Sequence, residues 1–228
     1  MNPLDLYAKI EPLIGFDEQY EKLYKIYLEW LKSLHVKQVL DIGCGNGKFL
    51  LHLQKNDFFA RGIERSAHMV ERAQSLGVDA STQELSELVQ NSFDCVVAIA
   101  DVLNYIPADE LPLFFQEVSS VLKSGGYFLC DINTLHGFEG VADGVMSKET
   151  ENIFLCIEAN FEAKQLHTNI TLFEKEGDLY HKEQGSITQY FHSLTSLKKI
   201  GVFKFCTSKS VSLFSKEADK TIMLLQKR

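Results

Sequence analysis

The spacing of apolar residues changes along the chain, and these changes predict the order of helices and strands. Residues 17–34 place leucine and tyrosine at three- and four-residue intervals, which indicates an amphipathic helix. Short continuous apolar runs predict strands at 36–42, 58–63, 93–99 and 127–132. Helical patterns separate these runs, at 49–53, 67–76 and 109–122, and Gly125-Gly126 marks the last helix-to-strand turn. Because buried parallel strands are apolar throughout and are joined by helices, the alternation predicts a doubly wound α/β fold with a mostly parallel sheet.

The pattern changes after residue 135. Weakly alternating runs at 153–157, 167–173 and 187–191 predict antiparallel strands, with a hairpin turn at Glu176-Gly177-Asp178. We interpret residues 137–190 as an antiparallel insertion laid on the sheet, which is well placed to shape a substrate pocket. A helix at 192–199 and strands at 202–205 and 221–225 follow. We therefore expect a single domain, 1–228, with an N-terminal helical segment (1–35), a core (36–136), the insertion (137–190) and a C-terminal part of the core (191–228).

Composition narrows the class of protein. With 228 residues, 24% charged and 11% aromatic, the chain is long enough for a packed core and is not of the disordered type. No apolar run approaches the ~20 residues that a membrane-spanning helix needs, and the first residues lack a signal-peptide pattern. Five cysteines without a CxxC pair predict free thiols in a reducing cytoplasm, with no disulfide framework and no metal site. The net charge of −8 disfavours a nucleic-acid partner, although bases outnumber acids over 198–228.

A glycine-rich loop and a later carboxylate carry the first chemical signal. Asp41-Ile-Gly43-Cys-Gly45-Asn-Gly47 lies between a predicted strand and helix, where a ligand can approach the backbone. Lys48 occupies the third glycine position of a dinucleotide fingerprint, and Asp41 suits an ammonium or sulfonium better than a pyrophosphate. Glu64 ends the next strand, where a carboxylate can accept both hydroxyls of a ribose. A tight turn without a ligand is the alternative for the loop alone, but the two features together predict a nucleoside.

Four segments in order resemble the motifs of class I S-adenosylmethionine-dependent methyltransferases: Val39-Leu-Asp-Ile-Gly-Cys-Gly-Asn-Gly, Gly62-Ile-Glu-Arg-Ser-Ala-His-Met, Ser92-Phe-Asp-Cys-Val-Val and Val121-Leu-Lys-Ser-Gly-Gly-Tyr-Phe. The resemblance covers about residues 36–133. Asp101-Val-Leu-Asn-Tyr-Ile and Phe128-Leu-Cys-Asp-Ile-Asn-Thr are similar to the small-molecule branch that includes glycine and sugar-amine N-methyltransferases. This resemblance implies a seven-stranded Rossmann-like sheet with an antiparallel insertion after the fifth strand, which would act as a substrate lid.

The resemblance also implies S-adenosyl-L-methionine as cofactor and a role for each matching residue. Asp41, Gly43 and Gly45 would hold its methionine end, with Cys44 as a small residue of the same loop. Glu64 would take the ribose hydroxyls, Arg65 lies beside it, and Met69 would pack near the adenine. Glu84 would read the adenine amino group, with Leu85 as its backbone neighbour, and Ala100 and Asp101 would border the methionine and the substrate mouth. The branch has Tyr-Asp where this chain has Glu11-Pro12, so Tyr7 or Tyr20 would take over that contact.

The acceptor is less constrained, because methyl transfer from a sulfonium needs mainly orientation. Asn104 and Tyr105 follow the fourth strand, and Asn133 and His136 follow the fifth, at the edge where parallel sheets bind ligands. We treat His136 as a candidate base and Tyr105 as a second catalytic candidate, with a loop histidine as the alternative for His136. No Asn/Asp-Pro-Pro-Tyr and no Pro-Cys occurs, which argues against nucleobase or amide acceptors.

The leading hypothesis is therefore a methyltransferase that acts on a nitrogen or oxygen of a small molecule, as a monomer or homodimer. An RNA methyltransferase that uses the basic C-terminal segment is one alternative, and a non-catalytic cofactor-binding protein is another. A nicotinamide-dependent oxidoreductase is a third, against which Lys48 and Asp41 both argue.

Overall fold

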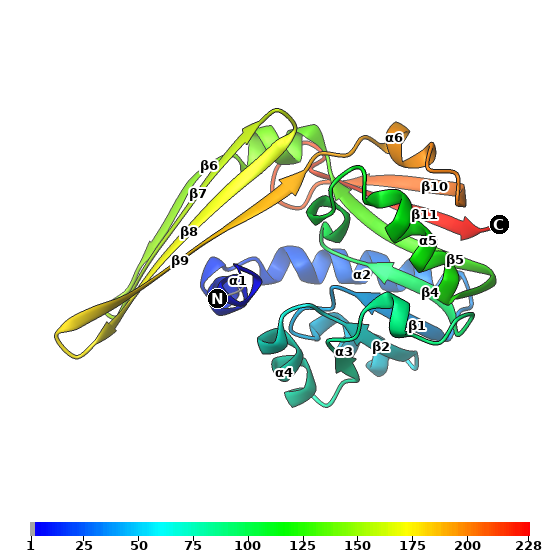
Figure 1. Cartoon of the computed structure of the whole chain (residues 1–228), viewed down its shortest axis with the longest axis horizontal. Helices are drawn as coiled ribbons and strands as arrows, with labels where there is room; N and C mark the ends of the chain where they lie inside the picture. The colour runs from blue at the N-terminus through cyan, green and yellow to red at the C-terminus, as the bar shows by residue number, and fades with distance from the viewer. Residues whose placement is uncertain (1–2) are drawn as a thin grey trace.

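A computed structural model describes residues 3–228, and a seven-stranded mixed sheet forms its centre (Figure 1). The strand order is β10-β11-β5-β4-β1-β2-β3. Adjacent strands in the part of the sheet that runs β5-β4-β1-β2-β3 are parallel, whereas β11 is antiparallel to both β5 and β10. This arrangement confirms the predicted fold class. The strands are β1 (Gln38–Ile42), β2 (Phe59–Ile63), β3 (Ala80–Ser81), β4 (Phe93–Ala98), β5 (Leu122–Asn133), β10 (Phe203–Val211) and β11 (Lys220–Lys227).

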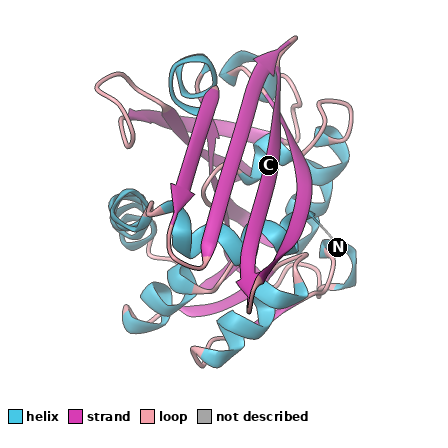
Figure 2. Cartoon of the chain, turned by 90° about the vertical axis from the view of Figure 1, so that its left-hand side faces the viewer, coloured by secondary structure: helices cyan, strands magenta, loops and turns pink. Residues whose placement is uncertain are grey.

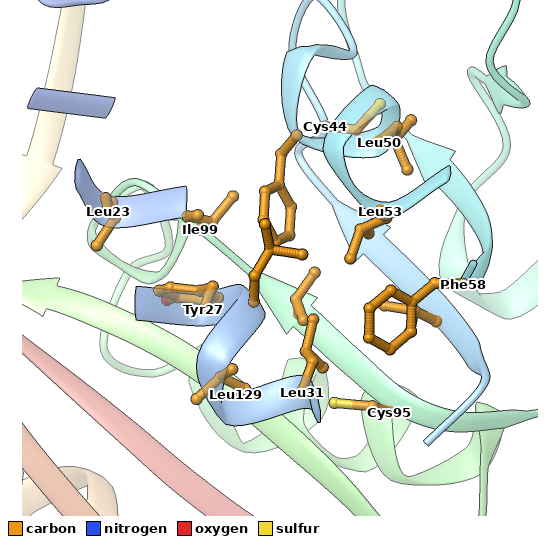
Figure 3. Close-up of a cluster of buried hydrophobic side chains, with 14 of the residues drawn as sticks. Leu23, Tyr27, Leu31, Cys44, Leu50, Leu53, Phe58, Cys95, Ile99 and Leu129 are labelled. Atoms are coloured by element: carbon orange, nitrogen blue, oxygen red, sulfur yellow. The ribbon is translucent and has the colours of Figure 1, made fainter. Parts of the chain in front are cut away.

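Helices cover both faces of this sheet because its central strands are apolar on both sides. Val39 and Leu40 are adjacent in β1, are both fully buried, and pack into two separate clusters. Figure 3 shows part of the first cluster, in which Leu23, Tyr27 and Leu31 pack toward the sheet. One face carries α2 (Asp17–Ser33), α3 (Lys48–Lys55) and α4 (Ala67–Ser75); the other carries α5 (Leu111–Val121), α6 (Leu194–Lys198) and η1 (Leu85–Glu87).

The insertion forms a second, four-stranded antiparallel sheet that projects from the core (Figure 1), and Figure 2 shows it from its side of the molecule. Helix α1 (Pro3–Ile14) packs against it, with Leu6 and Ile10 buried among Leu155, Ile170 and other apolar residues of the sheet. Gly177 has φ +65° in the β8–β9 turn, as the hairpin signal predicted. The strands are β6 (Gly144–Glu149), β7 (Ile153–Glu162), β8 (Gln165–Glu176) and β9 (Leu179–Tyr190).

Several element boundaries differ from the predicted ones. Strands β7 to β9 are longer than the apolar runs that predicted them, since backbone pairing continues where both faces become exposed. Strand β6 escaped prediction because it is exposed at every position except Met146. Gly125 has the expected positive φ, of +72°, but lies inside β5, which begins at Leu122 with an irregular register against β4. No helix among residues 3–228 is long and apolar enough to span a membrane.

Candidate active site

The glycine loop joins β1 to α3 and is tied to the end of β2. The N–H groups of Gly43 and Cys44 donate to the Ile63 carbonyl oxygen, at 2.8 and 3.2 Å. Gly43, Gly45 and Gly47 all have positive φ, of +68°, +53° and +79°. A Cβ on Gly43 or Gly47 would collide with neighbouring atoms, but one on Gly45 would meet nothing within 4 Å. Gly45 therefore faces open space, which leaves the backbone there accessible to a ligand.

Asp41, the penultimate residue of β1, is fully buried, and neither of its carboxylate oxygens has a hydrogen-bond partner. Burial, and secondarily the nearby Glu64 charge, raises the pKa of Asp41 well above its usual range. Buried polar groups in folded proteins are almost always bonded. An unpartnered carboxylate beneath a ligand-accessible loop is therefore suited to a cationic ligand group.

Glu64 lies immediately after β2 and is held by backbone groups. Its carboxylate accepts hydrogen bonds from the N–H of Gly45 at 3.1 Å and of Ser66 at 2.9 Å. A carboxylate has about four lone-pair sites, so acceptor positions remain for two ligand hydroxyls. The chain thus presents a fixed acid directly beside the open part of the glycine loop.

The other predicted cofactor residues lie in the glycine loop, on α4 or just before it, and at the start of η1. Cys44 is buried, and its sulfur lies so close to Gly62 that a Cβ there would meet it at 2.5 Å. Met69 is buried on α4, whereas Arg65 is exposed just before that helix. Glu84 is exposed and Leu85 is buried, at the start of η1. The roles of these residues in binding stay predictions.

The turn after β4 carries two strained residues. Ala100 and Asp101 have φ of +64° and +60°, a region that costs non-glycine residues roughly 1–2 kcal/mol each. The buried carboxylate of Asp131 on β5 stabilises the turn, because it accepts both backbone N–H groups at 2.9 Å. Tyr27 of α2 donates its hydroxyl to the same carboxylate at 2.6 Å. The strained turn places the Asp101 side chain at the carboxyl edge of the sheet.

A cavity of about 300 Å³ lies at this edge, between the core, α1 and the insertion. Asp101 and Tyr105 enter it from the turn and from η2 (Val102–Tyr105), and Asn133 enters from the end of β5. Tyr7 and Tyr20 share a hydrogen bond there. Apolar walls come from the insertion, from the end of α1 and from two loops: Met146, Ile157, Leu166, Ile170 and Ile187, with Ile14, Phe16 and Phe214.

The cavity gathers most of the polar residues that the sequence singled out. Tyr7, Tyr20, Tyr105, Asp101 and Asn133 all line it. Burial raises the pKa of Tyr7 to about 12 and the pKa values of Tyr20 and Tyr105 well above their usual range. The tyrosine hydroxyls are therefore protonated at neutral pH and are suited to donate hydrogen bonds.

Two predicted residues lie elsewhere. Asn104 of η2 is fully buried and links η2 to β9 and β5. Its side-chain amide donates to the Tyr190 carbonyl oxygen and accepts from the Asn133 N–H. His136 precedes η3 (Gly137–Ala142), and its Nε2 lies 2.9 Å from the Ser215 hydroxyl. Neither side chain is part of the cavity lining, and the roles predicted for Asn104 and His136 stay predictions.

Two lining residues that bond Asp101 escaped the sequence-based selection. Lys220 at the start of β11 is buried and donates to Asp101 and Asn133, at 2.9 and 2.8 Å. Gln189 of β9 donates to Asp101 at 2.6 Å. Gln189 lies two residues after Ile187 in a predicted strand and therefore on the same face, so its inward orientation could have been predicted. Lys220 gave no such signal, because a lysine at the edge of an apolar run is ordinarily exposed.

Helix α1 closes the site from the other side. Glu11 accepts hydrogen bonds from the Asn46 amide of the glycine loop at 2.7 and 2.9 Å. Arg72 of α4 donates to the Ala8 carbonyl oxygen at 2.7 Å. Glu11 departs from the pattern of the similar branch, and it contacts the loop through Asn46. The polar side of α1 therefore covers the glycine loop while its apolar side packs on the insertion.

Comparison with known proteins shows which proteins this chain is similar to. Residues 39–126 match the family described as "Methyltransferase domain". A methyltransferase-named protein of Geobacillus sp. is 29% identical over 126 residues, which are 51% of each chain. The chain spans about half the length of the curated relatives it matches.

Two solved structures share the fold over nearly the whole chain. An S-adenosylmethionine-dependent methyltransferase from Clostridium acetobutylicum has a TM-score of 0.80 at 22% identity, covering 97% of both chains. The sugar N-methyltransferase KedS8 from Streptoalloteichus has a TM-score of 0.73 at 14% identity, covering 99% of this chain and 93% of its own. At these low identities the comparison shows a shared fold, and the shared fold includes the insertion.

Proposed function

We infer, from the premise that residues 39–126 form a class I S-adenosylmethionine-dependent methyltransferase domain, that the protein methylates a nitrogen or oxygen of a small molecule. The family and its cofactor are those that the motifs predicted. The observation that carries the proposal is the position of the cavity: Asp101 and Tyr105 follow β4 and line it, and the adjacent Val102 contacts the glycine loop. A volume of about 300 Å³ suits a small acceptor, at the lower end of the ~300–1,000 Å³ typical of ligand pockets.

The residues of the glycine loop fit the cofactor. Gly45 leaves the backbone open, Asp41 offers an unpartnered buried carboxylate to a cationic group, and Glu64 offers free acceptor positions to ribose hydroxyls. When bound, S-adenosylmethionine supplies a methyl group activated by a sulfonium. The protein's part is to orient the acceptor and exclude water, and orientation alone can account for ~7–11 kcal/mol of the barrier.

The cavity indicates how an acceptor is held. Its apolar walls suit a largely apolar body, and its polar residues gather at the edge that meets the core. Asp101 accepts a hydrogen bond from the nitrogen or oxygen to be methylated, and the protonated Tyr105 hydroxyl donates one. A sugar N-methyltransferase among the neighbours of the same fold supports a small-molecule acceptor.

Calorimetry with S-adenosylhomocysteine tests the cofactor half of the proposal. We expect binding of S-adenosylhomocysteine and no binding of NAD; binding of NAD alone would refute the methyltransferase assignment. Labelled S-adenosylmethionine incubated with fractionated metabolites, and separately with total RNA, tests the acceptor half. We expect label in a small molecule; label confined to RNA would favour the RNA alternative, and binding without transfer to either would favour the non-catalytic one.

Two lysines of the basic C-terminal segment are engaged within the protein, so fewer of its side chains are free to bind RNA than its composition suggested. Lys220 is buried against carboxylates, and Lys227 donates to Asn91 and to the Leu122 carbonyl oxygen. Location in the cytoplasm and a monomeric or homodimeric state stay predictions.

A further inference from the structure

Lys220 is a buried lysine whose hydrogen-bonding capacity is fully used. Its side chain is 3% exposed, and its Nζ lies 2.9 Å from Asp101 Oδ1, 2.8 Å from Asn133 Oδ1 and 3.3 Å from Asp131 Oδ2. A lysine ammonium has three protons to donate. Because all three face protein oxygens, Lys220 has none left for an acceptor in the cavity, and it acts on the site through its partners.

Asp101 is the partner that faces the cavity. Its Oδ1 accepts from Lys220, and its Oδ2 accepts from Gln189 at 2.6 Å and from Asn133 at 3.2 Å. A carboxylate offers about four lone-pair sites, so roughly one remains, on Oδ1. These donors come from β11, β9 and β5, which fixes the carboxylate from three directions.

The charges explain why a cation is needed there. The carboxylates of Asp101 and Asp131 lie 2.9 and 3.3 Å from the same Lys220 ammonium, and Asp131 is fully buried. Two carboxylates that close together in a water-poor site repel each other strongly. Lys220 lies between them and compensates this repulsion, which holds the Asp101 carboxylate at the position that the strained turn gives it.

We propose that Lys220 is a positioning residue that holds the Asp101 carboxylate in the orientation that accepts a hydrogen bond from the acceptor. The proposal rests on the proposed function and adds to it a residue from the basic C-terminal segment. It predicts that loss of Lys220 weakens use of the acceptor while leaving the glycine loop and its ligand unaffected. The reason is that none of the contacts of Lys220 involves the loop.

The experiment compares three variants of the full chain. Lys220→Met removes the charge, Lys220→Arg keeps it, and Lys227→Met is the control because Lys227 lies on the same strand but contacts no carboxylate. Calorimetry measures the dissociation constant of S-adenosylhomocysteine, and initial rates with the acceptor found by the labelled-methyl screen give KM and kcat.

We expect Lys220→Met to raise the acceptor KM about tenfold or more, the value of one charge-assisted hydrogen bond. The S-adenosylhomocysteine affinity should stay within about twofold, Lys220→Arg should recover much of the loss, and Lys227→Met should change neither quantity. An unchanged acceptor KM in Lys220→Met overturns the proposal. So does an equal loss of S-adenosylhomocysteine affinity without recovery by arginine, which is the signature of a merely structural role.

A spectroscopic measurement keeps the proposal testable if Lys220→Met does not fold. In the wild type, the ammonium protons of Lys220 should exchange slowly enough to be seen by ¹H–¹⁵N NMR, assigned by their absence in Lys220→Arg. Asp101→Asn should shift or broaden that signal, and no effect of Asp101→Asn overturns the proposal. Failure of the wild type to bind S-adenosylhomocysteine refutes the proposed function instead, which separates the two failures.

Discussion

Asp41→Asn gives the sharpest test of the proposed cofactor site. It should stabilise the ligand-free protein and at the same time weaken its binding of S-adenosylhomocysteine. The substitution keeps the shape of the side chain and removes its charge. Asp41 is fully buried, and both of its oxygens lack partners. A buried group left unsatisfied costs ~1–3 kcal/mol, and more when it is charged. We therefore expect the ligand-free variant to be about 1 kcal/mol or more stable at pH 8, roughly 2–4 °C in Tm.

The sign of the pH dependence follows from the raised pKa of Asp41. At a pH below the unfolded-state pKa of ~3.9, the residue is protonated in both states, so no buried charge destabilises the folded state. As the pH rises, the unfolded chain ionises first, so the folded state loses stability until the pH passes the raised folded-state pKa. The advantage of Asp41→Asn should accordingly be absent near pH 3 and grow toward pH 8.

Asp94→Asn supplies a control of opposite sign. Burial acts to raise the pKa of Asp94, but hydrogen bonds from the Gln38 N–H, the Lys123 side chain and the Lys37 N–H lower it overall. Its ionised form therefore stabilises the fold above the unfolded-state pKa, and that contribution is lost as the pH falls through the folded-state pKa. Asp94→Asn should destabilise the protein at neutral pH.

The assays are urea unfolding between pH 3 and pH 8 and calorimetry with S-adenosylhomocysteine, whose methionine end keeps its ammonium group. Removing a charged partner should weaken binding about 10- to 150-fold, from ~1.5–3 kcal/mol per charge-assisted hydrogen bond. If ligand-free Asp41→Asn is less stable than the wild type at pH 8, or binds S-adenosylhomocysteine equally well, the carboxylate is not held for a ligand.

Three further substitutions test neighbouring parts of the site. Glu64→Ala should weaken S-adenosylhomocysteine binding by about tenfold or more in calorimetry, since a charged acceptor is lost; an unchanged dissociation constant would remove Glu64 from the site. Gly45→Val should abolish that binding, whereas Gly77→Val, with a similar positive φ and an equally open environment, should retain it. Asp131→Asn should lower the free energy of unfolding by about 2 kcal/mol or more, because the amide nitrogen cannot accept one of the two backbone N–H groups of the strained turn, which is then left unsatisfied; a loss no larger than that of Tyr27→Phe, about 1 kcal/mol, would show that the carboxylate does not support the strained turn.

The sequence allowed prediction of those parts of the molecule that short-range patterns specify. The glycine loop, Glu64 and the β8–β9 turn at Gly177 each depend on neighbours within a few residues, and each lies where its pattern indicated. The predicted cavity residues Asp101 and Tyr105 also follow from position alone, because the carboxyl ends of parallel strands meet at one edge.

Residues whose setting depends on distant pairing could not be predicted in the same way. Lys220 contacts Asp101 across 119 positions of the chain, and only the pairing of β11 with β5 brings them together. His136 follows β5 as expected, but the backbone turns into η3 there and places the ring beside Ser215. Secondary-structure periodicity carries no information on either contact.

The acids at the two edges of the sheet differ in their hydrogen bonding, and this difference supports the proposed position of the site. At the carboxyl ends of the parallel strands, Asp41 lacks partners and Ala100 and Asp101 adopt strained backbone conformations. At the opposite edge, Asp94 is bonded to two backbone N–H groups and to Lys123. Local departures from stable packing persist where a function requires them. The acid at the amino edge of the sheet is therefore satisfied, whereas Asp41, at the edge that carries the glycine loop, is left unsatisfied.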